Sequence, residues 1–350
     1  MAESLTLVKF SDVELDDPFF DSLKAQYEEF TRWFISKNDQ LVYILRNDEG
    51  LLQGFVYLKI EDGVVDDIDP PLAAARRLKV GTLKIVAHGT RLGERALKKI
   101  FDHALKDDVD EVYVTVFDSH AGLINLFKKY GFIEKGNKVT RNGTEIVLLR
   151  SMERKVDDII LDYPYIKTEG VSKFLLAVYP EYHTKLFPDS ILNTEDSEII
   201  SDVSYTNTIH KVYIAKLYLT RMKRGDIVVI YRTTDIPGRA RFRSVVTSLC
   251  VVEETRARRD FVDVNNFLAF ALPHSVFPED ELRSLYAAGD RLYAVRMTYN
   301  AAFRKRTIRG RLLDEVGISE NPRWDLRLLT DGQFQKIVEL GSLDENIIVD

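Results

Sequence analysis

The segment 83–97 has the residue types of an anion-binding site. A strand pattern there passes through a short loop, with glycines at 89 and 93, into a helix pattern. Such a turn presents unpaired backbone N–H groups at the positive end of a helix dipole, where a phosphate is stabilised. Arg91 and Arg95 can add charge. Many strand–glycine–helix turns bind nothing, so this segment alone leaves both a phosphate site and a plain connection open.

A second segment adds to this pattern. Residues 114–120 form a strand pattern, and a helix pattern that ends in Phe127-Lys128-Lys129-Tyr130-Gly131-Phe132 follows. Together the two segments resemble the GNAT acetyltransferase superfamily over about residues 35–150. The acetyl-CoA loop of that family reads Arg/Gln-x-x-Gly-x-Gly/Ala. Here His88, Arg91 and Gly93 occupy those positions, so only the last glycine is kept.

The resemblance implies transfer of an acetyl group from acetyl-CoA, as co-substrate, to an amine. The pantetheine arm would pair like an added strand with backbone groups of Ile85 and Val86, and the pyrophosphate would meet the N–H groups of residues 91–96. A strand N–H near Val86 would polarise the thioester carbonyl. The cofactor-binding residues implied are Ile85, Val86, Ala87, Arg91, Leu92, Gly93, Glu94, Arg95 and Ala96.

The proton-transfer residues depart from the family pattern. Phe127 stands where many members have a tyrosine that acts as the general acid, and His120 stands where the family often has asparagine. Tyr130 and His120 are therefore the candidate catalytic residues. Each has a structural alternative, because Tyr130 can be a buried aromatic that closes its helix and His120 can be a helix N-cap. A thiolate of pKa about 8.5 can also leave without an acid.

The elements that must position these residues read as an α/β unit. Strand patterns cover 41–45 and 53–60 around a turn, and further strands cover 82–87, 111–116 and 145–149. Helical spacing of apolar residues runs from Leu92 to Leu105, and a shorter helix covers 120–130. These patterns predict a mixed sheet flanked by helices over residues 1–160.

The C-terminal half is mainly strand-like, with strands expected at 174–179, 226–232, 244–253 and 291–298. A Gly225-Asp226 turn leads into an apolar strand that ends in Tyr231-Arg232, and the strand expected at 244–253 comes after it. This pattern resembles the PUA-like barrels, which include ASCH and EVE domains. The resemblance implies a β-rich barrel with helices over 161–350 that binds RNA or another substrate.

Charge bears on that binding role. The 350 residues include 49 Lys and Arg against 55 Asp and Glu, a net charge of −6, so the whole molecule does not attract nucleic acid. Residues 239–311 alone hold 14 basic and 8 acidic residues, a net charge of +6, so the rest of the chain carries a net charge of −12. RNA or tRNA contact and a solvated surface of salt bridges both remain open. Possible base-stacking faces are Tyr213, Tyr231, Phe242 and Phe303.

The remaining composition predicts a cytoplasmic protein without a membrane segment. Cys250 is the single cysteine and suits a reducing compartment. The N-terminus has neither a basic nor an apolar signal region, and no apolar run approaches about 20 residues. Histidines and carboxylates show no metal-ligand spacing, so no metal is expected.

The sequence therefore favours an acetyl-CoA-dependent N-acetyltransferase whose second domain binds the acceptor, with RNA or a tRNA-linked amine as one acceptor class. A toxin-type enzyme with an antitoxin partner would have this architecture by analogy. Two alternatives stay open. One is a non-catalytic RNA-binding protein on an acyl-CoA fold, and the other is a small-molecule or polyamine acetyltransferase.

Overall fold

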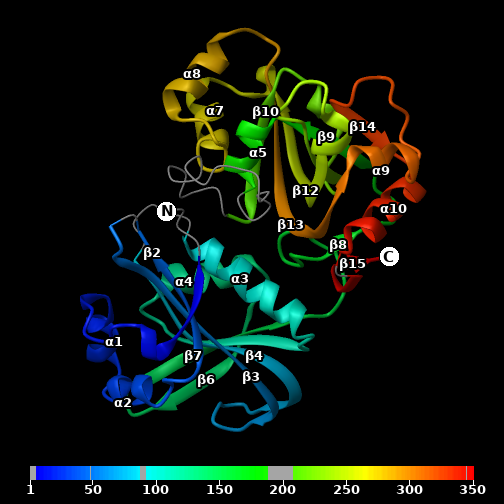
Figure 1. Cartoon of the computed structure of the whole chain (residues 1–350). Helices are drawn as coiled ribbons and strands as arrows, with labels where there is room; N and C mark the ends of the chain where they lie inside the picture. Colours follow the sequence, from blue (N-terminus) through cyan, green and yellow to red (C-terminus); the bar gives the residue numbers. More distant parts are fainter. Residues whose placement is uncertain (1–4, 48, 87–91, 188–207, 344) are drawn as a thin grey trace. The chain divides into compact units, whose positions relative to one another are not determined.

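The computed structural model describes residues 5–47, 49–86, 92–187, 208–343 and 345–350. The chain forms two compact units, Met1–Glu153 and Arg154–Asp350. The boundary expected from composition lies near residue 160. Both units combine sheets and helices, which confirms the mixed α/β class (Figure 1).

The first unit is built on one seven-stranded sheet in the order β1-β2-β3-β4-β5-β7-β6. Neighbouring strands are antiparallel except β4 and β5, which are parallel. The strands are β1 (Thr6–Lys9), β2 (Leu41–Arg46), β3 (Leu52–Val65), β4 (Leu72–Ile85), β5 (Glu111–Phe117), β6 (Ile133–Thr140) and β7 (Gly143–Ser151). The helices are α1 (Asp21–Gln26), α2 (Phe30–Ile35), α3 (Leu92–Lys106) and α4 (Ala121–Lys129).

Helix α3 follows the predicted apolar spacing. Its residues Ala96, Leu97, Ile100, Phe101 and Ala104 are all buried, because positions three and four apart share the face that packs on the sheet. The strand expected at 82–87 is in fact the last part of β4, a strand of 14 residues. Its first half was missed because Ala73 to Arg77 lack the branched and aromatic residues that mark strands.

An aromatic cluster packs α2, and the turn that leads into α1, against the sheet. The ring centroids of Phe10, Phe20 and Phe34 all lie within 6 Å of that of Phe55 on β3. Phe55 is completely buried. The cluster thus holds the helices that form one wall of the cleft described below.

Removing the central ring of this cluster should destabilise the first unit strongly. We expect Phe55→Ala to lower the free energy of unfolding by about 3–5 kcal/mol, because the lost contacts leave a cavity. Urea unfolding of the full chain measures the loss. Phe242→Ala is the matched control, since its ring is 66% exposed, and should change stability by less than about 0.5 kcal/mol. Equal effects of the two substitutions would contradict the role given to the cluster.

The second unit holds a six-stranded sheet in the order β10-β13-β12-β11-β9-β14. The hydroxyl of Tyr213 on β10 donates a hydrogen bond to the carbonyl of Ala177 on β9 (3.3 Å), so the sheet curls enough for a side chain of its first strand to reach its fifth, although these two strands do not pair. Its strands are β9 (Lys173–Val178), β10 (His210–Ala215), β11 (Ile227–Arg232), β12 (Val245–Ala257), β13 (Tyr293–Ile308) and β14 (Leu326–Leu329). A separate pair joins β8 (Ile166–Lys167) to β15 (Ile348–Val349).

Helices α5 (Pro180–Leu186), α6 (Ala240–Arg243), α7 (Val264–Ala271), α8 (Glu279–Ala287), α9 (Arg309–Asp314) and α10 (Asp331–Gly341) complete the second unit. Helix α8 follows Pro278 and has Glu279, Asp280 and Glu281 in its first turn, where negative charge suits the helix dipole. Strands β9, β11, β12 and β13 occupy the predicted ranges, although β13 extends to residue 308. Within the described part of the chain, no helix combines the length and the apolarity that crossing a membrane requires.

A buried histidine makes the second unit sensitive to acid. His183 on α5 is fully buried, and its Nε2 lies 2.9 Å from Oγ1 of Thr247. Burial, with the nearby charges of Arg232 and Arg306, lowers the pKa of His183 to about 3. The folded protein therefore keeps this imidazole neutral at a pH where the unfolded chain, with a pKa near 6.5, is protonated.

The sign of the effect follows from this difference. The contribution of His183 is fully present above about pH 6.5 and is lost as the pH falls toward 3, by up to about 1.4 kcal/mol per pH unit. Urea unfolding of the second unit at pH 7, 5 and 4 measures it. In His183→Gln the unfolding free energy should fall less between pH 7 and 4 than in the unsubstituted chain. Equal losses would contradict this assignment.

Candidate functional site

The first unit contains a cleft where β4 and β5 separate. The two strands pair only from Arg77↔Glu111 to Val80↔Val114, yet β4 continues to Ile85 and β5 to Phe117. The separation opens a cavity of about 580 Å³. It begins at Gly81, where an added Cβ would lie 2.7 Å from Cδ1 of Tyr57, so a side chain at this position would press on the ring that lines the cleft.

Backbone groups of β4 face this opening. The N–H of Val86 donates to the carbonyl of Gln53 (2.8 Å), on the side of β3. Successive residues of a strand turn their N–H groups to opposite edges, so the N–H groups of Ile85 and Leu83 face the side that β5 has left. The N–H of Val86 itself is thus taken up by β3, and the amide near Val86 that faces the opening is that of Ile85.

A buried carboxylate lies in the same cleft. Glu145 is the third residue of β7, lies directly opposite Phe117 of β5 and is 5% exposed. The hydroxyl of Tyr27 donates to Oε1 of Glu145 at 2.7 Å. Burial, together with this hydrogen bond, raises the pKa of Tyr27 well above its usual range. Tyr27 therefore stays protonated and holds the carboxylate in place.

His120 also lines the cleft. It occupies the N-cap position of α4, but its side chain makes no capping hydrogen bond. Instead its Nε2 lies 3.2 Å from Nε2 of Gln26 on α1. The imidazole is thus directed by a side chain across the cleft and not by its own helix.

Tyr130, the other candidate catalytic residue, lies elsewhere. It is the C-cap of α4, is fully buried, and does not belong to the residues that line the cleft. Its carbonyl accepts a hydrogen bond from Arg150 (2.9 Å). Phe127 is likewise buried and packs edge-on against Phe132, with ring centroids 4.7 Å apart. These positions correspond to the structural alternative that the sequence left open for Tyr130.

The implied cofactor-binding residues fall in two groups. Ala87 and Arg91 lie outside the described residues, as does His88, and Leu92 to Ala96 form the first turn of α3. Leu92, Arg95 and Ala96 in this turn are buried, and the carboxylate of Glu94 bonds to Lys129 at 3.0 Å. An added Cβ at Gly93 would lie 2.8 Å from Cδ2 of Leu126, so this glycine also lets α3 approach α4 closely.

The outer part of the cleft carries a cluster of charges on β3 and β4. Glu61 lies 3.0 Å from the ammonium of Lys59 and 3.6 Å from that of Lys79, and it accepts a hydrogen bond from Tyr113. Burial alone would raise the pKa of Glu61, but the hydrogen bonds from Tyr113 and Lys59 lower it overall. Glu61 thus has three partners of its own, two of them cations, whereas the partner shown for Glu145 in the cleft is the neutral hydroxyl of Tyr27.

No group of three or more His, Cys, Asp or Glu side chains within the described ranges is arranged to hold a metal ion. Glu145, Tyr27 and His120 are among the titratable side chains that line the cleft, together with Glu29, Glu61 and several lysines.

The arginine-rich window of the second unit is paired in part. Seven of its 14 cations form ion pairs: Arg241–Asp314, Arg243–Asp235, Arg256–Glu254, Arg259–Asp260, Arg283–Glu279, Arg309–Glu320 and Arg311–Glu315. Four of the carboxylates lie outside residues 239–311, so the net charge of the window overstates the local field. Of the four expected stacking faces, Tyr231 and Phe303 are buried and Phe242 is exposed. Contact with RNA stays a prediction.

Comparison with known proteins gives distant structural neighbours only. No family model and no curated protein matches the chain. Among solved structures, a mutant of the ZmASCH protein from Zymomonas mobilis is 14% identical, with 48% of this chain and 95% of that chain covered and a TM-score of 0.33. The ribosomal-protein-S18-alanine N-acetyltransferase from Escherichia coli is 18% identical (44% and 98% covered, TM-score 0.30).

A third neighbour, the NatC complex bound to Gag peptide and CoA, is 14% identical, with 43% of this chain and 99% of that chain covered and a TM-score of 0.31. The neighbours thus include both acetyltransferases and ASCH proteins, each matching about half of the chain. Identities and scores this low assign the chain to no family.

Proposed function

We propose that the first unit is an N-acetyltransferase that moves an acetyl group from acetyl-CoA to an amine. The observation that carries the proposal is the separation of β4 and β5, which places outward-facing amides of β4 and the buried carboxylate of Glu145 in one cleft. An extended, amide-containing arm fits the open edge of a strand. A carboxylate held by a tyrosine fits the removal of a proton from an amine.

The amides of Ile85 and Leu83 supply the electrostatic part of the reaction. They hydrogen-bond the arm and the thioester carbonyl, on which negative charge develops when the amine attacks. Strand amides are fixed by the ladder on the other side of β4, so they need no reorganisation during the reaction. The first turn of α3 contributes further amides without intrahelical partners for the phosphates.

Glu145 supplies the proton transfer. It takes the proton that the acceptor ammonium must lose, so the nitrogen lone pair can form the new bond to the acetyl carbon. The carbon–sulfur bond then breaks with its electron pair on sulfur. The second proton, which the new amide nitrogen must still lose, passes to the departing thiolate, whose thiol has a pKa of about 8.5, so no separate protein acid is needed. Tyr27 is a positioning residue for Glu145, and His120 lies close enough in the cleft to bind the acceptor. Tyr130 has no part in this scheme.

The second unit is proposed as the acceptor-binding module, over about residues 161–350. RNA-linked amines and small amines both remain acceptor classes under this proposal. The paired arginines weaken the case for RNA, because exposed ion pairs leave fewer cations for phosphates. A toxin role and an antitoxin partner stay predictions that no residue here supports.

Release of free thiol from acetyl-CoA tests the proposal. The full chain is incubated with acetyl-CoA and, in separate reactions, with pooled polyamines, peptides with free N-termini, and tRNA. Thiol should appear faster with at least one amine pool than without it, and the acetylated amine should be found by mass spectrometry. Saturable binding of acetyl-CoA without turnover of any pool would favour the non-catalytic alternative.

A further inference from the structure

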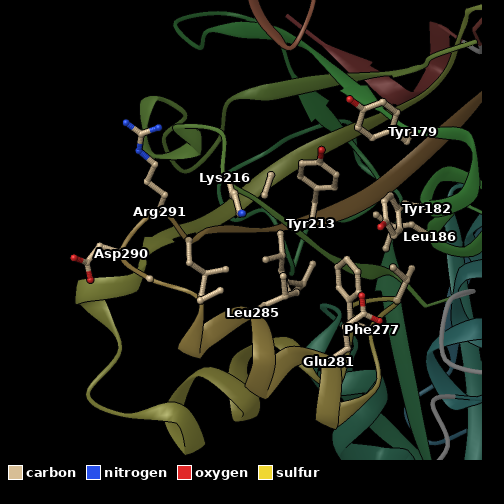
Figure 2. A pocket seen from close by; sticks show the side chains of 17 residues that line it. Tyr179, Tyr182, Leu186, Tyr213, Lys216, Phe277, Glu281, Leu285, Asp290 and Arg291 are labelled. Carbon is tan, nitrogen blue, oxygen red and sulfur yellow. The ribbon is translucent and has the colours of Figure 1, made fainter. Parts of the chain in front are cut away.

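The second unit holds a pocket that the proposed acetyl transfer does not use. It has a volume of about 670 Å³ and lies between β10, α5 and α8 (Figure 2). Four aromatic rings, those of Tyr179, Tyr182, Tyr213 and Phe277, contribute to its wall, and the ring centroids of Tyr182 and Phe277 are 5.4 Å apart. Leu285 of α8 adds aliphatic surface. Such a wall fits a large apolar side chain or ring.

Strand β10, which forms one side of this pocket, is an edge strand. It comes first in the sheet order and pairs with β13 alone. The N–H of Tyr299 bonds to the carbonyl of Ile209, whereas the N–H of Val212 bonds to the carbonyl of His274, away from β13. Backbone groups alternate between the two edges of an antiparallel strand, so Ile214, like Val212, turns its N–H and C=O to the free edge.

The chain itself already uses the first part of this edge. Thr208 donates to the carbonyl of His210, and the segment at His274 accepts from Val212, much as an added strand would. Past this point, within the described ranges, Ile214 has no backbone partner on its free side. Both Val212 and Ile214 line the pocket. An open edge beside an apolar pocket is the arrangement that binds an extended chain by strand addition.

Charged side chains mark the two ends of the pocket. Figure 2 shows Lys216 at one end and Glu281 near Tyr182 and Phe277 at the other. Arg291 and Asp290 lie on the Lys216 side, and the guanidinium of Arg291 extends outward, so this side carries two cations against one carboxylate. None of Lys216, Glu281 and Arg291 has an ion-pair partner in the described part of the chain, in contrast to the paired arginines elsewhere in this unit. They are therefore available to an occupant of the pocket.

We infer that β10 binds an extended peptide segment of a partner protein, with one large apolar side chain in the aromatic pocket and an acidic residue near Lys216. The backbone of the peptide pairs with Ile214, and the pocket selects the side chain. The charges at the two ends select the acidic residue and set the direction of the peptide. This site is independent of the acetyl transfer proposed for the first unit.

Fluorescence anisotropy with labelled heptapeptides tests the inference on the full chain. The probes have alternating threonine and valine, a central phenylalanine, and one glutamate placed either before or after it. We expect saturable binding of one of the two glutamate arrangements. Replacing the phenylalanine by glycine, or methylating the amide that pairs with Ile214, should weaken binding about tenfold or more. Methylation of the neighbouring amide, which faces away from β10, should have little effect.

Two protein variants locate the site. Ile214→Pro removes the outward N–H but no ladder bond to β13, and should weaken the peptide about tenfold. Lys216→Glu should weaken the glutamate peptide and not its glutamine counterpart, whereas Lys223→Glu, at an exposed lysine outside the pocket, should change neither. If Ile214→Pro does not fold, the methylated peptides test the same bond. Absence of saturable binding by every probe, or equal effects of methylation at both amides, would overturn the inference.

Discussion

Replacing Glu145 by glutamine should lower kcat/KM for acetyl transfer by about a hundredfold or more, the usual contribution of a positioned general base. Glutamine keeps the size of the side chain and can still accept the hydrogen bond from Tyr27, but it cannot take a proton from the acceptor. The loss should therefore appear in turnover, with little change in the binding of acetyl-CoA. Thiol release under single-turnover conditions, with the best amine of the pool, measures it.

The control for this substitution is Glu134→Gln. Glu134 is exposed on β6 and pairs with Lys128 (3.3 Å), so the same chemical change there should leave kcat/KM within about twofold. His120 provides the opposing case. If His120→Asn abolishes turnover while Glu145→Gln does not, the imidazole takes the proton and the role given to Glu145 is wrong.

Replacing Ile85 by proline should lower kcat by about 10²–10³-fold, as loss of one donor to a developing negative charge does. Proline lacks the N–H, and at Ile85 that N–H faces the separation from β5 and not the ladder to β3. Because the same amide also pairs with the acyl-CoA arm, the affinity for acetyl-CoA should fall as well. Stopped-flow thiol release and direct titration separate the two effects.

Ile85→Ala is the matched control, since it shortens the side chain but keeps the amide. It should retain most of the activity, and both variants should show the far-UV circular dichroism of the unsubstituted chain. Equal losses in Ile85→Ala and Ile85→Pro would show that the side chain matters and the amide does not. Full activity of Ile85→Pro would remove the amide from the reaction.

The sequence predicts those parts of the site that depend on local pattern. The helical spacing that begins at Leu92 and the strand pattern that ends before His120 have the expected positions in the structure. His120 could be named because it directly follows that strand. Local periodicity is sufficient for such elements, because the burial of one helix face or one strand face fixes them.

The remaining parts depend on long-range pairing, which no local pattern records. Glu145 becomes a cleft residue only because β7 pairs with β5 and brings it opposite Phe117, 28 positions away in the sequence. Its signal in the sequence is a lone acidic residue at the start of an apolar strand, and that signal is common. The direction of the Val86 N–H likewise depends on the register of β4 against β3, and a shift by one residue would reverse it.

Charge counting failed for a similar reason. The window of residues 239–311 reads as +6, but Asp235, Asp314, Glu315 and Glu320 lie just outside it and pair with its arginines. A count over a stretch of sequence omits carboxylates that the fold brings back to that stretch. Half of these cations thus belong to salt bridges, the alternative to contact with nucleic acid, and contact through the others stays a prediction.

Calorimetric titration of the full chain with acetyl-CoA tests the central claim most directly, because each step proposed for the cleft requires the donor to bind along β4. The account predicts saturable binding at one site per chain, weakened strongly in Ile85→Pro and retained in Glu145→Gln. Absence of saturable binding by the folded, unsubstituted chain would contradict it.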